Sequence, residues 1–295
     1  MRKFFTLFLI TALTGAATYS QNSTENTVSF KDYPQNLGPT INTSANEYAA
    51  LVTPWDSLMY FTSTRGKKMN THGNEKIYYC LGAPNDSSIQ VYPTKGFKKS
   101  VHISIAGVDS KNEKILFYKG KRKNGSLNSA KINYGKVLKK KILKGAINHV
   151  AYRESSISIA EDGSAYVVID RVGGHGKKDI WVCKHNGSGR FSGLQNLGSV
   201  INTKYNEEAV YISPDGNTLY FSSEGHDSLG GYDIFKTTKN EDGSWTEPVN
   251  MGSMINSPAN ELFFQPYPGD NIILFSSDRD GGNGGYDIYS ISVNE

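Results

Sequence analysis

Residues 196–235 read NLGSVINTKYNEEAVYISPDGNTLYFSSEGHDSLGGYDIF, and residues 250–289 repeat the pattern as NMGSMINSPANELFFQPYPGDNIILFSSDRDGGNGGYDIY. Both stretches contain Asn-x-Gly, Ile-Asn, Asn-Glu, an apolar run that ends in Ser-Ser, and Gly-Gly-Tyr-Asp-Ile. Self-similarity at a fixed period of 20 to 50 residues is the signature of repeat architectures. The sequence therefore predicts a repeat protein.

The Glu of the Asn-Glu pair measures the period. The same position recurs five times at intervals of 52 to 55 residues, at Glu47, His102, Glu154, Glu207 and Glu261. Five units therefore fill the chain from about residue 36 to its end.

Each unit predicts four short antiparallel strands, which we call a to d in chain order. In the fourth unit, residues 208–213 alternate between apolar and polar, and residues 218–223 form a second β-branched and aromatic run after a Pro-Asp-Gly turn. Such runs separated by turn residues are typical of β-hairpins. A Gly-rich loop then leads to a third run at residues 232–238, and an Asp-Gly turn leads to a fourth at residues 244–249.

A tandem repeat of four strands predicts an all-β fold, a β-propeller of five four-stranded blades. The last unit stops after its strand c, whereas residues 28–38 read as a strand d with no blade before it. Phe30, Pro34 and Asn36 occupy the places that Trp245, Pro248 and Asn250 take in the fourth unit. We expect this N-terminal strand to complete the last blade, which would remove the open edge of the ring.

Three motifs resemble a known family. The turn Ser-Pro-Asp-Gly at residues 213–216, the strand Tyr-Phe-Ser-Ser at 220–223 and the strand Gly-Gly-Tyr-Asp-Ile-Tyr at 284–289 resemble the WD40-like propeller repeats of bacterial envelope proteins. Such repeats are found in TolB and beside peptidoglycan-binding OmpA-type domains. The resemblance is strongest in units four and five and weakest in unit two. It implies a platform for binding other proteins, and it implies no reaction, because one fold hosts many functions.

The N-terminus predicts export. Arg2 and Lys3 precede an apolar stretch at residues 4–17, and residues 1–20 together read as a signal peptide that is too short to span a membrane. Residues 21–27 form a polar leader, and residues 28–295 form a single propeller domain. No cysteine follows the apolar stretch and no later segment is long and apolar enough to cross a bilayer, so we expect a periplasmic or extracellular protein without a lipid anchor.

The two cysteines occupy the same place in strand c of units one and three. A whole blade separates Cys80 from Cys183, which at sheet spacings of about 10 Å puts them roughly 15 to 20 Å apart. A disulfide requires Cα atoms within about 7 Å. We expect two buried free thiols.

The charges are distributed unevenly. Residues 95–144 contain fifteen of the 32 basic residues and two of the 28 acidic residues, within a chain whose net charge is +4. Lys119, Lys121, Arg122 and Lys123 stand at the b-to-c turn of unit two, and a basic binding patch is one hypothesis for them. The alternative is a solvated loop beside an edge strand protected by lysines. If the patch binds, an anionic polysaccharide or an acidic protein fits better than nucleic acid, because few aromatic residues are near to stack on bases.

The second unit leaves one structural alternative open. Residues 136–145 contain three consecutive lysines and read either as strand d or as a short helix.

Carboxylates repeat at the start of strand a. Glu47, Glu154, Glu207 and Glu261 would suit a glycosidase that gathers acidic residues from several blades around a central funnel. However, an acid and a base need different surroundings to separate their pKa values, whereas these residues recur at one position. We therefore expect them, with Asn46, Asn206 and Asn260, to bind backbone amides.

The b-to-c loop of unit five is rich in oxygen donors. Asp278, Asp280, Asn283 and Asp287 alternate with glycines, as hard cations such as calcium require. The spacing is not that of an EF-hand, and tight Gly turns with capping Asp residues explain it as well. We expect no other metal and no cofactor.

The sequence predicts an exported interaction module without enzymatic activity, because it contains no nucleophile elbow, phosphate loop or paired Cys motif. The predicted partner is an envelope protein, an OmpA-type peptidoglycan-binding protein among them. The predicted binding face carries the d-to-a and b-to-c loops, with Glu207, Glu261, Asp227, Asp280 and Arg279. The alternative is a glycan-binding or glycan-cleaving five-bladed propeller. A third possibility is a subunit whose peptidoglycan-binding domain belongs to a neighbouring protein.

Overall fold

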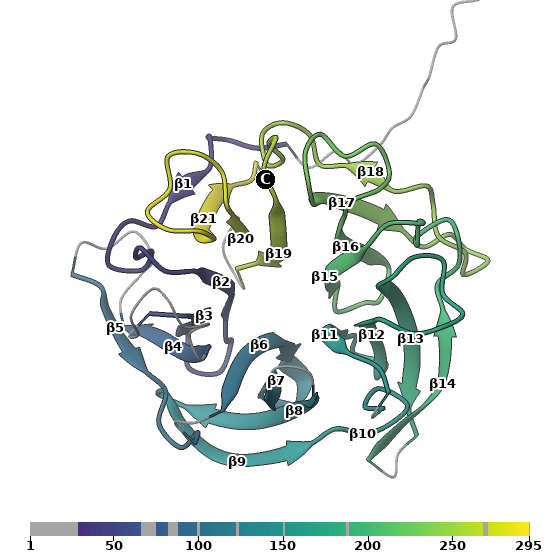
Figure 1. Cartoon of the computed structure of the whole chain (residues 1–295), viewed down its shortest axis with the longest axis horizontal. Coiled ribbons are helices and arrows are strands. Elements are labelled where there is room, and N and C mark those ends of the chain that lie inside the picture. The colour runs from purple at the N-terminus through teal and green to yellow at the C-terminus, as the bar shows by residue number, and fades with distance from the viewer. Residues whose placement is uncertain are drawn as a thin grey trace, which may run out of the picture.

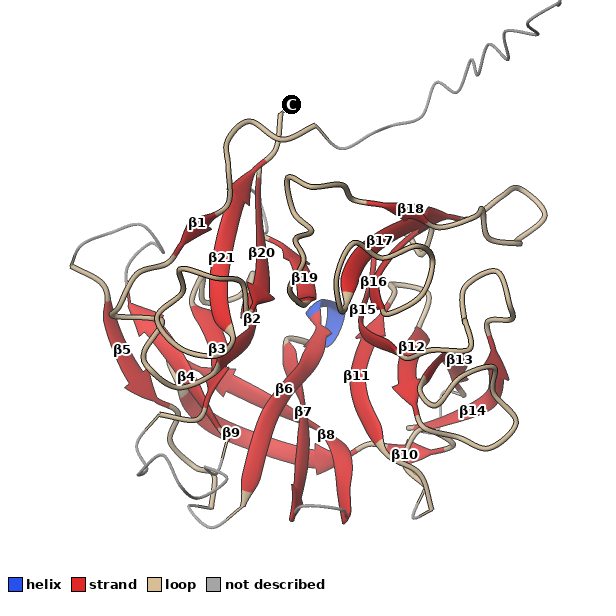
Figure 2. Cartoon of the chain, turned by 45° about the horizontal axis from the view of Figure 1, so that its top comes forward, coloured by secondary structure: helices blue, strands red, loops and turns tan. Residues whose placement is uncertain are grey.

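The computed structural model describes residues 29–65, 75–81, 88–98, 101–121, 124–149, 151–186, 189–267 and 271–294. In this part of the chain the regular structure consists of β-strands and one 3-10 turn, η1 (Ser110–Asn112), which is coloured blue in Figure 2. None of the described helical residues forms a segment that is long and apolar enough to cross a membrane.

Five sheets surround a central axis, with β2, β6, β11, β15 and β19 innermost (Figure 1). Blade 1 contains β2 (Glu47–Val52), β3 (Met59–Ser63), β4 (Lys76–Leu81) and β5 (Gln90–Pro93). Blade 2 contains β6 (His102–Asp109), β7 (Lys114–Lys121), β8 (Asn124–Asn133) and β9 (Lys136–Ile142). Blade 3 contains β11 (Glu154–Ile159), β12 (Ser164–Ile169), β13 (Asp179–His185) and β14 (Arg190–Asn196), with β10 (Lys144–Gly145) added beside β14. Blade 4 contains β15 (Glu207–Ile212), β16 (Thr218–Ser223), β17 (Asp233–Thr238) and β18 (Val249–Asn250). Blade 5 contains β19 (Glu261–Pro266), β20 (Ile272–Ser277), β21 (Asp287–Ser292) and β1 (Gln35–Asn36).

The predicted closure of the ring is confirmed. β1 pairs antiparallel with β21, with Gln35 opposite Ser290 and Asn36 opposite Tyr289. Phe30 bridges Val293, and the amide of Asn294 donates to the carbonyl of Ser29. The N-terminal strand therefore completes the last blade, in the strand order β1-β21-β20-β19.

The outer strands of blades 4 and 5 are shorter than the sequence predicts. The run at residues 244–249 forms β18 only at its end, with an isolated bridge between Lys239 and Trp245. Pro248 and, in blade 5, Pro34 lack the N–H that a ladder needs, which interrupts pairing at these points. In blade 2, residues 136–142 form strand β9. The helical alternative for residues 136–145 is therefore wrong.

The core lies between neighbouring blades. Each of five apolar clusters is built from the facing sides of two adjacent sheets, and the largest fully buried rings include Phe61, Phe117, Phe221 and Phe275. In β2, Leu51 faces blade 2 while Val52 faces blade 5, as the alternation of side chains along a strand requires. Apolar burial therefore holds each blade to its neighbours.

A register shift of the kind that a β-bulge produces interrupts every innermost strand. The register shifts after Tyr48, Ile105, Glu154, Glu208 and Leu262. Residues at these shifts line the central channel, whose volume is about 30 Å³. At the bulge in blade 2, a Cβ on Gly107 would lie 1.8 Å from the carbonyl oxygen of Ile157, so only glycine allows blades 2 and 3 to approach this closely.

The prediction for the cysteines is confirmed. Cys80 and Cys183 are buried free thiols. Burial raises the pKa of each thiol to about 12, so both are protonated and unreactive at physiological pH.

Candidate functional site at the channel mouth

The repeated Glu residues hold the start of each strand a, as predicted. The carboxylate of Glu261 accepts hydrogen bonds from the backbone amide (2.8 Å) and hydroxyl (2.7 Å) of Ser257 and from the hydroxyl of Ser277 (2.6 Å). The same arrangement surrounds two equivalent residues, Glu47 and Glu207. These carboxylates therefore join the d-to-a loop to strand b.

The repeated carboxylates differ in their cationic partners. Arg279 lies 3.1 Å from Glu261, and Arg65 lies 3.5 Å from Glu47. Blade 4 has Gly225 in place of this arginine, and there burial, with a smaller contribution from the charge of Asp179, raises the pKa of Glu207 to about 7.

In blade 3, burial raises the pKa of Glu154 to about 7 in the same way, with the charge of Asp170 adding to it. Arg171, which occupies the position of Arg279 in this blade, lies over the rings of Tyr152 and Trp181 at 5.2 and 5.5 Å.

The calcium candidates accept hydrogen bonds from nitrogen. The carboxylate of Asp287 accepts from the backbone amides of Asn283 and Gly284 and from the side chain of Asn36. Asp278 accepts from both nitrogens of Asn260. Asp280 and Asn283 are exposed, and the side-chain amide of Asn283 donates to Asn36 at 3.2 Å. The described residues contain no cluster of three His, Cys, Asp or Glu side chains that would hold a metal ion.

The residues of the predicted binding face are divided between surface and interior. Asp227 and Asp280 are exposed in b-to-c loops. Glu207 and Glu261 have no exposed surface, and the guanidinium of Arg279 is held by Ser277 and the carbonyl of Ile255. Carboxylates without exposed surface cannot contact a partner directly, so Glu207 and Glu261 stabilise the loops of this face and do not bind a partner themselves.

The predicted basic patch lies at the β7–β8 turn. Lys119 is exposed on β7, and Lys121 is the last residue of that strand. Arg122 and Lys123 lie outside the described residues.

The residue after each repeated Glu reaches the mouth of the channel. The channel itself is lined by the next residues of the innermost strands, such as Ala49, Ala209 and Phe263. The side chain before the bulge therefore lies at the end of the channel on the face of the d-to-a loops. This position varies between the blades that carry the repeated Glu and holds, in order, Tyr48, Ser155, Glu208 and Leu262.

Tyr48 is the centre of a polar network at this mouth. Its ring stacks on Phe263 with centroids 5.6 Å apart, and its hydroxyl donates to Oε1 of Glu75 at 2.7 Å. Burial first, and then the charge and hydrogen bond of Glu75, raise the pKa of Tyr48 well above its ordinary value. The negative charge of Glu208 acts in the same direction, whereas a hydrogen bond with Ser104 lowers the pKa.

Glu208 of blade 4 interacts with its own blade and with both neighbouring blades at the same mouth. It forms an ion pair with Lys178 from blade 3. Burial, with the charge of Glu208 as the next cause, raises the pKa of Tyr232 in blade 4. In blade 5, burial and then the charges of Asp278 and Glu208 raise the pKa of Tyr286 to about 12. The tyrosines therefore remain protonated hydrogen-bond donors at every physiological pH.

The two mouth carboxylates have unlike surroundings. The side chain of Glu208 is 10% exposed and is paired with an ammonium group, whereas that of Glu75 is 31% exposed and lies 3.8 Å from the imidazole of His102. Two carboxylates in different environments can take different roles as proton donor and as base or nucleophile. Tyr48 and Phe263 add aromatic faces beside them. The arrangement can therefore hold a polar ligand that also presents an apolar face, such as a sugar ring.

Sequence reasoning missed Tyr48, Glu75 and Glu208. The repeat drew attention to the constant Glu, which is structural. The signal that marks the site is variation and not repetition. The position after the constant Glu changes from blade to blade in units that otherwise agree. Glu75 stands in a part of unit one that carries no repeated motif.

No protein-family model and no curated protein matches the sequence. Solved structures match at the level of the fold. One is the α-L-arabinofuranosidase of Podospora anserina in complex with cellotriose, with a TM-score of 0.54 and 10% identity over 91% of this chain and 98% of that one. A second, described as a glycoside hydrolase, has a TM-score of 0.56 and 9% identity over 89% and 92% of the two chains. TolB of Acinetobacter baumannii matches with a TM-score of 0.45 and 12% identity over 84% and 55%.

These likenesses correct the prediction that the chain has no enzymatic activity. Similarity at about 10% identity shows the fold alone. However, the solved structures that match nearly the full length with TM-scores above 0.5 include several glycoside hydrolases. The absence of a motif was therefore no ground for a non-catalytic reading, because this architecture supplies catalytic groups without a local motif.

Proposed function

We propose that the chain is a five-bladed propeller that binds and cleaves a glycan at the channel mouth. One observation carries the proposal: Glu75 of blade 1 accepts a hydrogen bond from the Tyr48 hydroxyl, and the charge of Glu208 of blade 4, in unlike surroundings, contributes to the raised pKa of the same hydroxyl. Glycoside hydrolysis uses a pair of carboxylates on either side of the scissile bond, one as the acid and the other as base or nucleophile. The glycoside hydrolases among the fold's neighbours support this reading.

The other mouth residues have defined roles in this proposal. Lys178 forms an ion pair with Glu208, and a carboxylate beside an ammonium group suits a nucleophile or base. Glu75 is more exposed and lies beside His102 and the Tyr48 hydroxyl, which suits the group that exchanges a proton with the leaving oxygen. Export through residues 1–20, which lie outside the described residues, would bring the protein to glycans of the envelope or the medium.

Hydrolysis and binding assays with Glu208→Gln and Glu75→Gln test the proposal. The substrates are arabinoxylan, cello-oligosaccharides, polygalacturonate and peptidoglycan. We expect the wild type to release reducing ends from one of them, and each variant to lose at least a hundredfold in kcat while it still binds, because general acid–base groups contribute about this much. Glu247→Gln, an exposed carboxylate of blade 4 away from the mouth, is the control and keeps full activity. A wild type that neither binds nor cleaves any of the four, or mouth variants as active as the control, overturns the proposal.

Capture of an envelope protein is a second function for the same face. Asp227 and Asp280, exposed in neighbouring b-to-c loops, favour it because rigid scaffolds present binding residues on such loops. An OmpA-type peptidoglycan-binding protein is the proposed partner. Retention of such a protein by the wild type but not by Asp227→Lys/Asp280→Lys, with an unchanged thermal midpoint, would support this function.

A further inference from the structure

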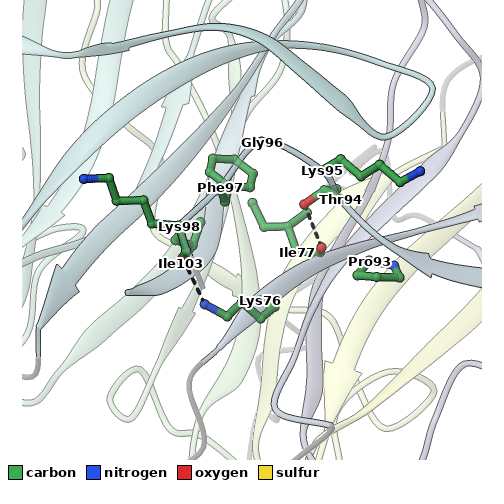
Figure 3. A pocket seen from close by; sticks show the side chains of 9 residues that line it. All are labelled: Lys76, Ile77, Pro93, Thr94, Lys95, Gly96, Phe97, Lys98 and Ile103. Carbon is green, nitrogen blue, oxygen red and sulfur yellow. Dashed lines mark hydrogen bonds between the residues drawn. The ribbon is translucent and has the colours of Figure 1, made fainter. Parts of the chain in front are cut away.

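A second cavity lies outside the channel, between blades 1 and 2, and has a volume of about 400 Å³ (Figure 3). Its polar lining includes Lys76, Lys95, Lys98 and Thr94, and Phe97 and Ile103 contribute apolar surface. None of the described residues that line it is acidic.

The wall of this cavity is fixed by the backbone. The amide of Lys95 donates to the carbonyl of Gly135 at 2.8 Å, and the amide of Val137 donates to the carbonyl of Lys95 at 2.9 Å. These bonds add the d-to-a connection of blade 1 to the outer edge of blade 2. The Phe97 ring then packs edge-on against Phe117, with centroids 5.1 Å apart. The cavity is therefore pre-formed, and a ligand does not have to order it.

The charge of the cavity has one sign. The ammonium group of Lys76 is held by the carbonyl of Val101 at 2.7 Å, while Lys95 and Lys98 are exposed. Lys140 extends the positive surface, since its ammonium donates to the carbonyl of Gly96 at 2.8 Å. A pre-formed basic cavity favours an anionic ligand, and exposed ammonium groups act on it as point charges.

The cavity adjoins the channel mouth through consecutive residues. Glu75 reaches the Tyr48 hydroxyl at the mouth, while the next residue, Lys76, lines the cavity. On the neighbouring strand, His102 lies near Glu75 and Ile103 lines the cavity. Consecutive Cα atoms are about 3.8 Å apart, so the backbone that borders the mouth also borders the cavity.

We propose that this cavity is a subsite for an acidic sugar of the glycan that the mouth binds, a proposal that rests on the function given above. The lysines would hold the carboxylate or sulfate group, and Phe97 and Ile103 would contact the apolar parts of the sugar. Nucleic acid fits less well, because Phe97 is the one aromatic ring among the described lining residues and successive bases need several.

Binding of defined trisaccharides by isothermal titration calorimetry tests the subsite. The probes are tri-galacturonate, its fully methyl-esterified form, a sulfated neutral trisaccharide and, as an anion without a sugar, tripolyphosphate. Each is measured with the wild type, Lys95→Gln/Lys98→Gln and Lys31→Gln/Lys184→Gln. The control pair consists of exposed lysines on blades 5 and 3, and it removes the same net charge. We expect the cavity variant to bind an acidic probe about tenfold more weakly than the wild type, and the control variant to bind within twofold. Preference between the carboxylated and the sulfated probe identifies the acidic group.

Three results would overturn the subsite: equal losses in both double variants, equal affinity for the esterified and the acidic trisaccharide, or tripolyphosphate binding as tightly as the acidic sugar. The Glu208→Gln variant separates this proposal from the proposed function. If Glu208→Gln binds the acidic probe normally and the wild type cleaves no glycan, the cavity is an acidic-sugar site but the mouth is not catalytic. If cleavage is confirmed and the cavity variant binds normally, only the subsite is wrong.

Discussion

At the scale of single residues, one buried carboxylate recurs in two electrostatic settings. Glu261 has an arginine at 3.1 Å, whereas the described residues give Glu207 no such partner. The Oε2 atom of Glu207 is buried without a hydrogen-bond partner among the described residues. Burial therefore raises the pKa of Glu207 from 4.5 to about 7. Between these two values the folded state holds a proton that the unfolded state has lost, so the contribution of this group to stability is full below pH 4.5 and falls as the pH rises to 7.

We expect Glu207→Gln to lose less stability than the wild type as the pH rises, because glutamine stays neutral. The free energy of unfolding of the variant should rise relative to that of the wild type by about 3 kcal/mol between pH 4.5 and pH 8. Urea unfolding at the two pH values measures it. Glu154, whose pKa burial also raises to about 7, remains in the variant, so a smaller decline persists.

The matched control is Glu261→Gln, which breaks the ion pair with Arg279. It should destabilise the protein at pH 8 instead of stabilising it. If the wild type and Glu207→Gln lose stability in parallel between the two pH values, the carboxyl of Glu207 does not carry the raised pKa that its burial implies.

At the scale of the strands, asparagine side chains replace missing backbone pairs. β18 and β1 are two residues long, and beyond them the side chain of Asn256 or Asn42 continues the ladder. Asn256 accepts from the amide of Ile234 at 2.8 Å and donates to its carbonyl at 2.9 Å. Asn202 does the same for Ile180 in blade 3. Asparagine side chains therefore satisfy the backbone hydrogen-bonding groups that the short outer strands leave unpaired.

We expect Asn256→Ala to cost about 2 to 3 kcal/mol in the free energy of unfolding. The substitution leaves the buried amide of Ile234 without an acceptor, and an unsatisfied buried donor carries its full desolvation penalty. Urea denaturation measures the loss. Asn240→Ala removes an exposed bond to Ser244 and should change stability by less than about 0.5 kcal/mol. Equal losses in the two variants would contradict the role given to Asn256.

The elements that the sequence predicted best are those that local chemistry determines. The Pro-Asp-Gly turn and the run before Gly225 give β15 and β16 to within one residue, because turn residues and alternation are local signals. Blade 2 was the hardest unit, since it lacks Asn-Leu-Gly and Asn-Glu. Yet the side chain of Asn148 hydrogen-bonds both the backbone amide and the carbonyl of Leu127 in this blade. The pair Ile147-Asn148 therefore corresponds to the Ile-Asn pair of the other units and could have marked the end of unit two.

The candidate site was less predictable than the fold, for a physical reason. Repetition reveals what every blade needs, and a site built once for the whole ring is not repeated. Glu208 follows the constant Glu207 in the sequence, but its neighbours Tyr48 and Tyr286 come from blades 1 and 5. Only closure of the ring places these side chains around one channel, so their proximity depends on long-range packing.

At the scale of the whole molecule, stability depends on the strand that closes the ring. Beyond the β1–β21 pairs, Phe30 packs in the cluster between blades 4 and 5, and Asn36 donates to Asp287 at 2.8 Å. Without these contacts β21 would be an open edge with unpaired backbone groups, and exposed edges template association with other chains. The N-terminal segment should therefore contribute far more stability than its length suggests.

Two truncations separate this contribution from that of the leader. A chain starting at residue 29 keeps every described contact and should unfold at the wild-type urea midpoint. A chain starting at residue 39 should unfold at a markedly lower midpoint and elute as oligomers in size-exclusion chromatography, because both the apolar cover and the edge pairing are lost. A peptide of residues 29–38 added in excess should restore the monomer and raise the midpoint. If the shorter chain is monomeric and as stable as the longer one, blade 5 does not need its N-terminal strand, and the ring is held by packing between blades alone.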